Sequence, residues 1–306
     1  MYRKFIVCLI IVSGWPGVRS IYAQDTSGLL KLVNTDQSKT TQYVNGAFNS
    51  TRVIMQQSVE SLAPGTMDFR ILHRFGLIKD GSSTFFGLDQ AYFRLGFDFG
   101  ITKDLMVGIG RSTADKEYDG FIKYRLLHQR TGYHPMPVTV SLVVGVTVIS
   151  QDISQSAGKD DPPFADRMAY TYQVIIGRKF NEKLTLQVSP TMVYRNLVTM
   201  AADNNNLYAL GFGGRMKITH RLSLTADYFL DLNNYSGSGR YNALAVGVDI
   251  ETGGHTFQLH LTNATGMNER AVIADTNYSW GKGEIAFGFN LSRIFNLKKN
   301  RKITFN

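Results

Sequence analysis

Apolar and polar residues alternate one for one in a succession of stretches of roughly ten residues between Asp68 and Ile294. In an extended strand successive side chains point to opposite faces, so each stretch predicts a strand with one apolar and one polar face. After residue 23, no apolar run reaches the roughly 18 residues that a membrane-spanning helix needs. A bilayer tolerates only helices or closed barrels, because every backbone amide must be paired within the protein. The pattern therefore predicts an all-β fold, a transmembrane antiparallel up-and-down β-barrel.

The number of strands is constrained by barrel closure. Thirteen stretches qualify, whereas bacterial single-chain barrels use even numbers of strands. Either residues 51–60 pack partly inside the lumen, which leaves 12 strands, or residues 42–48 form a further first strand, which gives 14. We predict about 12 strands. The candidate stretches are residues 51–60, 67–75, 91–101, 105–113, 120–127, 138–149, 169–180, 184–195, 207–218, 222–232, 241–251, 255–262 and 284–294.

Short turns alternate with long polar loops along this pattern. Gly253-Gly254 and Ala63-Pro64-Gly65 supply the dihedral angles that tight turns require. Outer-membrane barrels have their short turns in the periplasm, which orients the chain. The link 128–137 breaks the alternation, because it is long where a short turn is expected. The longest loops, residues 151–167 and 263–282, are where a barrel would present a binding surface.

The amino terminus has the layout of a secretory signal peptide, residues 1–23. Arg3 and Lys4 precede an apolar run, and the small residue Ala23 closes the segment. Residues 24–49 are polar and weakly patterned, which predicts a periplasmic arm or a plug. Residues 50–295 then form the barrel and residues 296–306 a basic periplasmic tail.

Composition narrows the chemistry of the exported chain. The only cysteine, Cys8, lies in the signal peptide, so the mature chain has no thiol or disulfide. Loss of Arg3, Lys4 and Arg19 lowers the formal charge from +9 to +6. A basic tail can bind nucleic acid, but export to the outer membrane argues against that partner. The expected partners are outer-membrane lipid and a small polar solute.

The alternation assigns side chains to the two faces of the wall. In residues 138–148 every second residue is valine or leucine, whereas Thr139, Ser141 and Gly145 lie on the other face. Basic residues on the lumen face come early in the chain and acidic ones late. If the strands follow in order around the barrel, one wall is basic and the opposite wall acidic. The lumen-lining or binding candidates are Arg70, Arg74, Arg94, Asp98, Lys123, Arg125, Arg195, Arg215, Asp227, Asp231, Asp249 and Glu284.

Several short motifs resemble one family. They include His73-Arg74-Phe75-Gly76, Asp98-Phe99-Gly100-Ile101-Thr102 and Gly108-Ile109-Gly110-Arg111-Ser112, and they are densest between Arg70 and Leu127. Together they resemble the β-barrel family labelled domain of unknown function 5777. The resemblance implies a barrel in the outer membrane of Gram-negative bacteria and transfers no catalytic residue.

Three classes of function are compatible with such a barrel. The first is a passive, porin-like conduit or binding barrel in which a transverse field orients small polar or anionic solutes. In the second, the charges pair across a filled interior and the barrel is a non-conducting structural or assembly module. A continuous water-accessible path past Arg94, Arg125 and Asp227 would favour the first class, and a sealed interior the second.

The third class, a barrel-embedded hydrolase, finds little support. Such an enzyme needs a histidine beside a serine or an acid. Of the six histidines only His260 is clearly inward, and none belongs to a serine, zinc or phosphate-binding signature. The acidic residues of the loop 151–167 lack the spacing of a calcium loop. We therefore expect no catalytic residue, no metal site and no cofactor.

Overall fold

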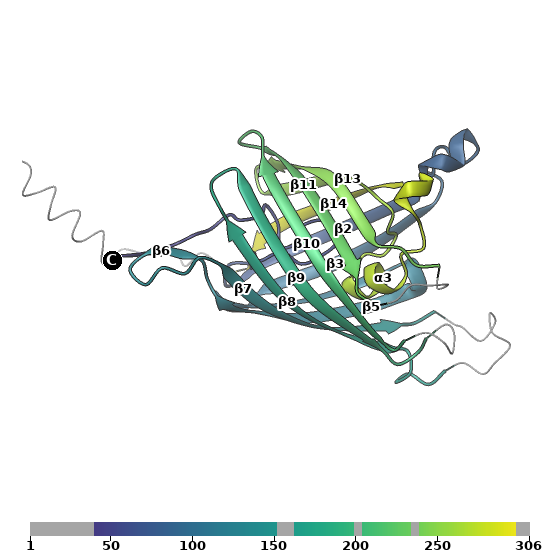
Figure 1. The fold of residues 1–306 in the computed structure, drawn as a ribbon, viewed down its shortest axis with the longest axis horizontal. Coiled ribbons are helices and arrows are strands. Elements are labelled where there is room, and N and C mark those ends of the chain that lie inside the picture. The colour runs from purple at the N-terminus through teal and green to yellow at the C-terminus, as the bar shows by residue number, and fades with distance from the viewer. Residues whose placement is uncertain (1–39, 152–161, 199–203, 234–238, 298–306) are drawn as a thin grey trace, which may run out of the picture. The chain divides into compact units, whose positions relative to one another are not determined.

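The computed structural model describes residues 40–151, 162–198, 204–233 and 239–297. Within these ranges 12 antiparallel strands form one closed barrel (Figure 1). The predicted fold class and strand number are confirmed. The wall strands are β2 (Thr66–Leu77), β3 (Ala91–Gly100), β4 (Leu105–Ser112), β5 (Glu117–Leu127), β7 (Thr139–Ile149), β8 (Met168–Lys179), β9 (Leu184–Arg195), β10 (Asn206–Lys217), β11 (Leu222–Asp231), β12 (Ala243–Thr252), β13 (His255–Thr262) and β14 (Ala286–Asn296). The signal peptide, residues 24–39 of the polar arm and residues 298–306 of the tail lie outside the described ranges.

The wall closes between its first and last strands. β14 pairs with β2 in a register that sets Leu291 opposite Ile71, with one irregularity between Ala286 and Gly288. All other neighbours in the wall follow chain order. Within the described ranges, closure leaves no wall strand with an unpaired edge, which is the condition for placing a sheet in lipid.

The two faces of the wall follow the predicted alternation. On β3, Leu95 and Phe97 expose 37% and 38% of their surface, whereas the flanking Arg94 and Asp98 are fully buried. On β7, Val144 points outward and is 49% exposed, and Ser141 points inward and is fully buried. The apolar band therefore lies outside and the polar residues line the interior.

A charge placed in the middle of the apolar band tests this assignment. Val144 is the central residue of β7, and Val144→Arg is expected to lower the free energy of unfolding in lipid vesicles by about 2–4 kcal/mol. Met216 faces outward near the end of β10. Met216→Arg is expected to lower the free energy of unfolding by at most about 1 kcal/mol. Urea titrations of both variants provide the comparison. Equal effects at the two positions would contradict the membrane placement.

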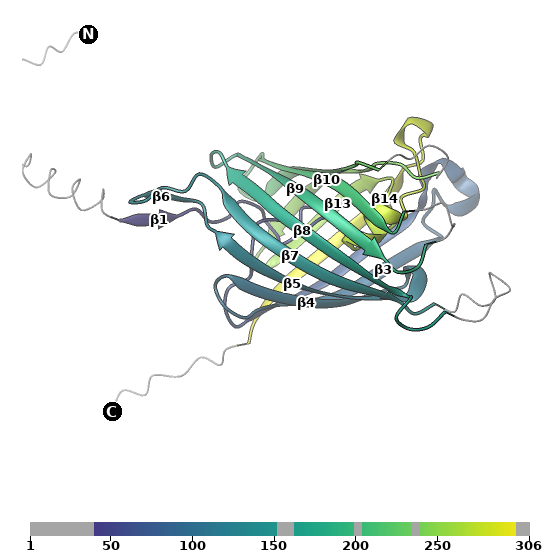
Figure 2. The same ribbon diagram turned by 60° about the horizontal axis from the view of Figure 1, so that its bottom comes forward.

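The long link 128–137 contains a further strand. β6 (Arg130–Gly132) pairs with β1 (Thr41–Tyr43) to form a small two-stranded sheet beyond one end of the barrel (Figure 2). Arg130 also bridges to Met136, so the link folds back on itself. The link is therefore long because it pairs with the chain that leads into the lumen.

Helices in the described ranges are short. They comprise η1 (Ile78–Thr84), η2 (Ala114–Lys116), α3 (Glu269–Ala274) and η3 (Trp280–Lys282). In these ranges no helix combines the length and the apolar character needed to cross a membrane. Short turns, such as residues 253–254, gather at one end of the barrel, and residues 263–285 connect strands at the other end. We call these ends the short-turn mouth and the long-loop mouth.

Candidate functional site

Residues 46–62 lie inside the barrel as a hairpin, which we call the lumen hairpin. Every residue from Ser50 to Val59 is buried. Its limbs pair through a bridge between Arg52 and Gln57 and through the Ser58 amide, which donates to Thr51 O at 2.9 Å. The stretch 51–60 is therefore the lumen-packed alternative of the two that the sequence left open. The plug-like part of the chain also extends past residue 49, where the sequence placed its end.

Asp227 on β11 anchors the tip of the hairpin. Its Oδ2 atom accepts hydrogen bonds from the amides of Ile54, Met55 and Gln56, at 3.2, 2.8 and 3.1 Å. Its Oδ1 atom accepts one from the Gln56 side chain at 2.5 Å. Consecutive amides that converge on one oxygen form an anion-binding concavity. Asp227 thus satisfies three backbone donors that would otherwise be buried without partners.

Uncharged side chains from three other strands hold the backbone of the hairpin. Gln258 of β13 donates to Val53 O at 2.5 Å, and Asn290 of β14 donates to Ile54 O at 3.0 Å. Gln187 of β9 donates to Gln57 O at 2.8 Å and accepts from the Val59 amide at 3.2 Å. These contacts replace the water that a lumen-exposed backbone would otherwise require.

Three predicted basic residues hold the limbs. Arg70 donates to the hydroxyls of Ser50 and Thr51 at 2.5 and 2.7 Å. Arg215 donates to Gly46 O and Ala47 O at 2.9 and 2.7 Å. The Lys123 ammonium donates to Glu60 O. These side chains therefore bind the protein's own backbone and hydroxyl groups.

Apolar packing completes the fit of the hairpin. Its tip, through Ile54 and Met55, joins a buried cluster with Phe229 on the wall and with Val272 and Ile273 of α3. Its limbs, through residues such as Phe48 and Val59, join a second cluster against β4, β5, β7 and β8. The hairpin is thus fixed by both polar and apolar contacts.

A second insert enters the barrel from the long-loop mouth. Residues 263–285, the α3 loop, connect β13 to β14 and place α3 in the interior, where all six of its residues are buried. Asn268 caps this helix by accepting from the Ala271 amide at 2.8 Å. The α3 loop meets the lumen hairpin through an ion pair between Arg52 Nη1 and Glu269 Oε1 at 3.0 Å. The two inserts therefore fill the lumen from opposite ends.

Arg270 fixes the α3 loop to the wall. Its guanidinium lies 2.5 Å from carboxylate oxygens of both Glu117 and Asp275, and 3.9 Å from Asp115. These three acids form the one group in the described ranges with the spacing of a metal site. Because Arg270 contacts all three carboxylates, it supplies the charge that would otherwise come from a cation.

Two of the basic lumen residues, Arg70 and Arg94, pair locally with acids, so the predicted basic wall is partly neutralised. Arg70 lies 2.8 Å from Asp68 on its own strand and 3.1 Å from Asp98 on the next strand. Arg94 pairs with Asp119 at 2.5 Å. Each of these cations on the basic half has an acid on the same or a nearby strand. Local pairing of this kind neutralises these two cations and weakens the predicted transverse field.

The remaining candidates contact the side chains that hold the hairpin or lie at the mouths. Arg74 donates to Asn290 Oδ1 at 2.9 Å, and Asp249 accepts from Thr225 and Gln258 at 3.2 and 3.1 Å. Arg195 donates to Asn204 O at 2.9 Å at the end of β9. Asp231 accepts from the Asn233 amide at 2.6 Å at the end of β11.

Glu284 was wrongly placed in the lumen. β14 begins at Ala286, so Glu284 belongs to the α3 loop, where it pairs with Lys79 at 2.8 Å. It also accepts from the Ser279 amide at 2.8 Å. The hydrogen bond from Lys79, followed by that from Ser279, lowers the pKa of Glu284 below its usual value.

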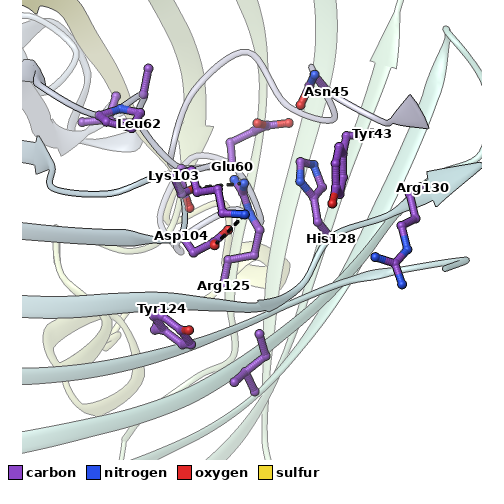
Figure 3. Close-up of a pocket in the computed structure, with 14 residues that line it drawn as sticks. Tyr43, Asn45, Glu60, Leu62, Lys103, Asp104, Tyr124, Arg125, His128 and Arg130 are labelled. Atoms are coloured by element: carbon purple, nitrogen blue, oxygen red, sulfur yellow. Dashed lines mark hydrogen bonds and ion pairs between the residues drawn. The ribbon is translucent and has the colours of Figure 1, made fainter. Parts of the chain in front are cut away.

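The path expected for an open pore is closed along the described part of the chain. Arg94 is fully buried and Asp227 is 1% exposed, so bulk water reaches neither of the two central positions on that path. Arg125, the third position, borders a cavity of about 510 Å³ at the short-turn mouth (Figure 3). Water therefore enters the mouth and stops at the hairpin.

His260 is buried on β13, with 2% of its surface exposed. Neither ring nitrogen has a hydrogen-bond partner among the described residues. A hydrolytic site would need a nucleophile or an acid in contact with this ring.

The sequence identified the anchoring charges but missed the residues they act on. Arg52, Glu269 and Asp119 were not singled out, and neither were the uncharged partners Gln187 and Asn290. The sequence did contain one signal for the insertion of α3 into the lumen. Within a long polar loop, Asn268 precedes the apolar run Ala271 to Ala274, which is the pattern of a capped, buried helix.

Comparison with known proteins assigns this barrel to a family. The family described as a membrane bound beta barrel domain (DUF5777) matches residues 48–295. The chain belongs to this family. The predicted resemblance is thereby confirmed, and the matched range takes in most of the lumen hairpin. No curated protein sequence matches the chain.

Several solved outer-membrane proteins share a distant likeness to this family member. The NanC porin is 9% identical, covering 74% of this chain and 98% of its own, with a TM-score of 0.46. The KdgM porin is 6% identical, covering 75% and 99%, with a TM-score of 0.45. The Acinetobacter baumannii outer membrane protein Omp33 is 9% identical, covering 75% and 98%, with a TM-score of 0.41. At such low identity and TM-score these likenesses carry no information on what this chain binds.

Proposed function

We propose that this protein works in the bacterial outer membrane as a gated conduit for small polar solutes, closed by the lumen hairpin. The predicted signal peptide and the membrane-bound barrel support that location, with the short-turn mouth in the periplasm. The lumen is occupied along its length, which by the criterion stated for the sequence favours a non-conducting barrel over a passive pore, so the conduit proposed here opens only when the hairpin withdraws.

The topology of the hairpin carries this proposal. Before the hairpin, the Val44 amide donates to Gln129 O at 2.9 Å, in the link between β5 and β7. After it, the Gly65 amide donates to Gly100 O at 2.7 Å, at the end of β3. Both limbs therefore pass through the short-turn mouth. Such a hairpin can withdraw toward the periplasm without threading a chain end through the barrel.

The wall exposed by withdrawal suits polar solutes. Arg70, Lys123, Arg215 and Asp227 would lose their hairpin partners and face the interior. Rings of charged side chains of this kind select solutes in pores. The alternative function is that of a permanently sealed barrel that presents its long loops to a partner. This alternative is favoured by the presence of two inserts, the lumen hairpin and the α3 loop, which enter the barrel from opposite mouths.

A disulfide lock distinguishes the two functions. The Cβ of a residue placed at Gly177 would lie 2.6 and 3.0 Å from the Cγ atoms of Val59, which suits a disulfide with Cβ atoms about 3.5–4.5 Å apart. The only natural cysteine, Cys8, lies in the signal peptide, so no other thiol competes. We expect the oxidised Val59→Cys/Gly177→Cys variant to be silent in planar bilayers, and reduction to restore wild-type openings.

Excision gives the complementary result. Replacement of residues 47–60 by a short glycine-serine linker is expected to produce steady conductance. For the disulfide lock, the single variants Val59→Cys and Gly177→Cys are the controls, because the conductance of neither should change on oxidation or reduction. A folded excision variant that conducts no ions would overturn the conduit and favour the sealed barrel.

A further inference from the structure

The cavity at the short-turn mouth lies between the hairpin and the barrel wall (Figure 3). The chain leading into the hairpin contributes Tyr43 and Asn45, and the limb leaving it contributes residues 60–64. β5 and the link after it supply Arg125 and His128. At about 510 Å³ the cavity has the size of a small-molecule site.

The charge of the lining favours an anion. Its cations are Lys103, Arg125 and Arg130, and its acids are Glu60 and Asp104. The Glu60 carboxylate is already used by the hairpin, because it accepts from the amides of Ala47 and Phe48. The cations of the lining therefore outnumber the acids that are available to neutralise them.

Arg125 is the cation best placed to receive a ligand. Its Nη1 atom donates to Lys103 O at a long 3.3 Å, and its buried Nε atom has no hydrogen-bond partner among the residues that the structure describes. No carboxylate in the described ranges pairs with it. A guanidinium presents a planar fork that matches carboxylate and phosphate oxygens. Arg125 thus has donor capacity that the protein itself leaves unused.

One wall of the cavity is aromatic. The rings of Tyr43 and His128 lie 5.0 Å apart at 30°, and Tyr43 is half exposed. The His128 Nε2–H donates to Val44 O at 2.9 Å, which fixes the ring. Burial, followed by the charge of Arg125, lowers the pKa of His128, so the imidazole is neutral at neutral pH. This wall offers a flat, uncharged surface to a ring.

We propose that this cavity binds a small organic anion that has a ring. Its phosphate or carboxylate group contacts Arg125, and its ring packs against Tyr43 and His128. Such a ligand touches the wall, the link after it and the chain segment that leads into the hairpin. If the hairpin gates a conduit, as proposed above, the bound anion holds the gate closed.

Isothermal titration of the full-length protein with phenyl phosphate tests the site. We expect saturable binding, and at least about tenfold weaker binding for Arg125→Ala, equivalent to about 1.4 kcal/mol. The matched control is Arg178→Ala, because the Arg178 guanidinium lies 5.1 Å from the Phe180 ring, away from the cavity. Benzoate shows whether a carboxylate can replace the phosphate.

A second variant separates the ring from the charge. Tyr43→Ala is expected to weaken binding of phenyl phosphate and to leave that of inorganic phosphate unchanged. Absence of binding by the wild type, or equal affinity for wild type and a folded Arg125→Ala, would overturn the site. If the protein binds phenyl phosphate but never conducts ions, the anion site stands and the proposed conduit is wrong. If it conducts ions but does not bind phenyl phosphate, the conduit stands and the anion site is wrong.

Discussion

Replacement of Asp227 by alanine is expected to convert a nearly silent barrel into one that opens frequently. The carboxylate receives three amides of the hairpin tip and the Gln56 side chain, and a hydrogen bond to a charged group contributes about 1.5–3 kcal/mol. Loss of even two such bonds destabilises the closed state by about 3 kcal/mol or more. Since every 1.4 kcal/mol is about tenfold, the ratio of open to closed states should rise by about 100-fold.

Single-channel recordings in planar bilayers measure this change. Asp227→Asn keeps an acceptor without the charge, so its open probability should lie between those of wild type and alanine variant. Glu182→Ala removes an exposed acid from the turn between β8 and β9 and should leave the recordings unchanged. A silent Asp227→Ala barrel that remains folded would show that the tip contacts do not control conduction.

Arg52→Met is expected to have the largest effect on stability. Arg52 and Glu269 form a buried ion pair, with side chains 1% and 11% exposed. Removal of one partner strands the other charge, which costs about 3–5 kcal/mol. The double variant Arg52→Met/Glu269→Gln strands no charge and should recover part of that loss, because residues in direct contact are coupled.

Urea unfolding followed by the fluorescence of Trp280 measures the cycle. Trp280, in the α3 loop, is the only tryptophan after residue 23, and its Nε1 atom donates to Leu244 O of β12 at 3.0 Å. Lys79→Met breaks an ion pair at the surface and should change the unfolding midpoint little. Additive losses in the double variant would mean that the two inserts pack independently.

The wall could be predicted from the sequence because lipid imposes a strict rule on it. Outward positions such as Leu95, Phe97 and Val144 must be apolar, and this requirement marks every strand. Inward positions carry no such rule, since a polar side chain can face water or the protein's own backbone. Asp227 was correctly placed inside, but nothing in its alternation indicates that it receives three amides.

The sequence could not decide between a wall strand and a lumen segment for the lumen hairpin, because residues inside the barrel follow no strict rule of polarity. Residues 51–60 counted among the thirteen strand candidates, and only the even number of strands in bacterial barrels argued otherwise. Glu284 was misplaced because the alternation was extended two residues beyond the true start of β14. The mouth cavity could not be foreseen, since it depends on pairing between β1 and β6 across a long separation in sequence.

The pairing of β14 with β2 has a consequence for biogenesis. The hairpin is synthesised before any strand of the wall, yet two of its backbone partners, Gln258 and Asn290, belong to the last two strands. Contacts of such long range form late. The set of hairpin contacts is therefore complete only when the last strand is in place, and we expect closure of the barrel and full enclosure of the hairpin to occur together.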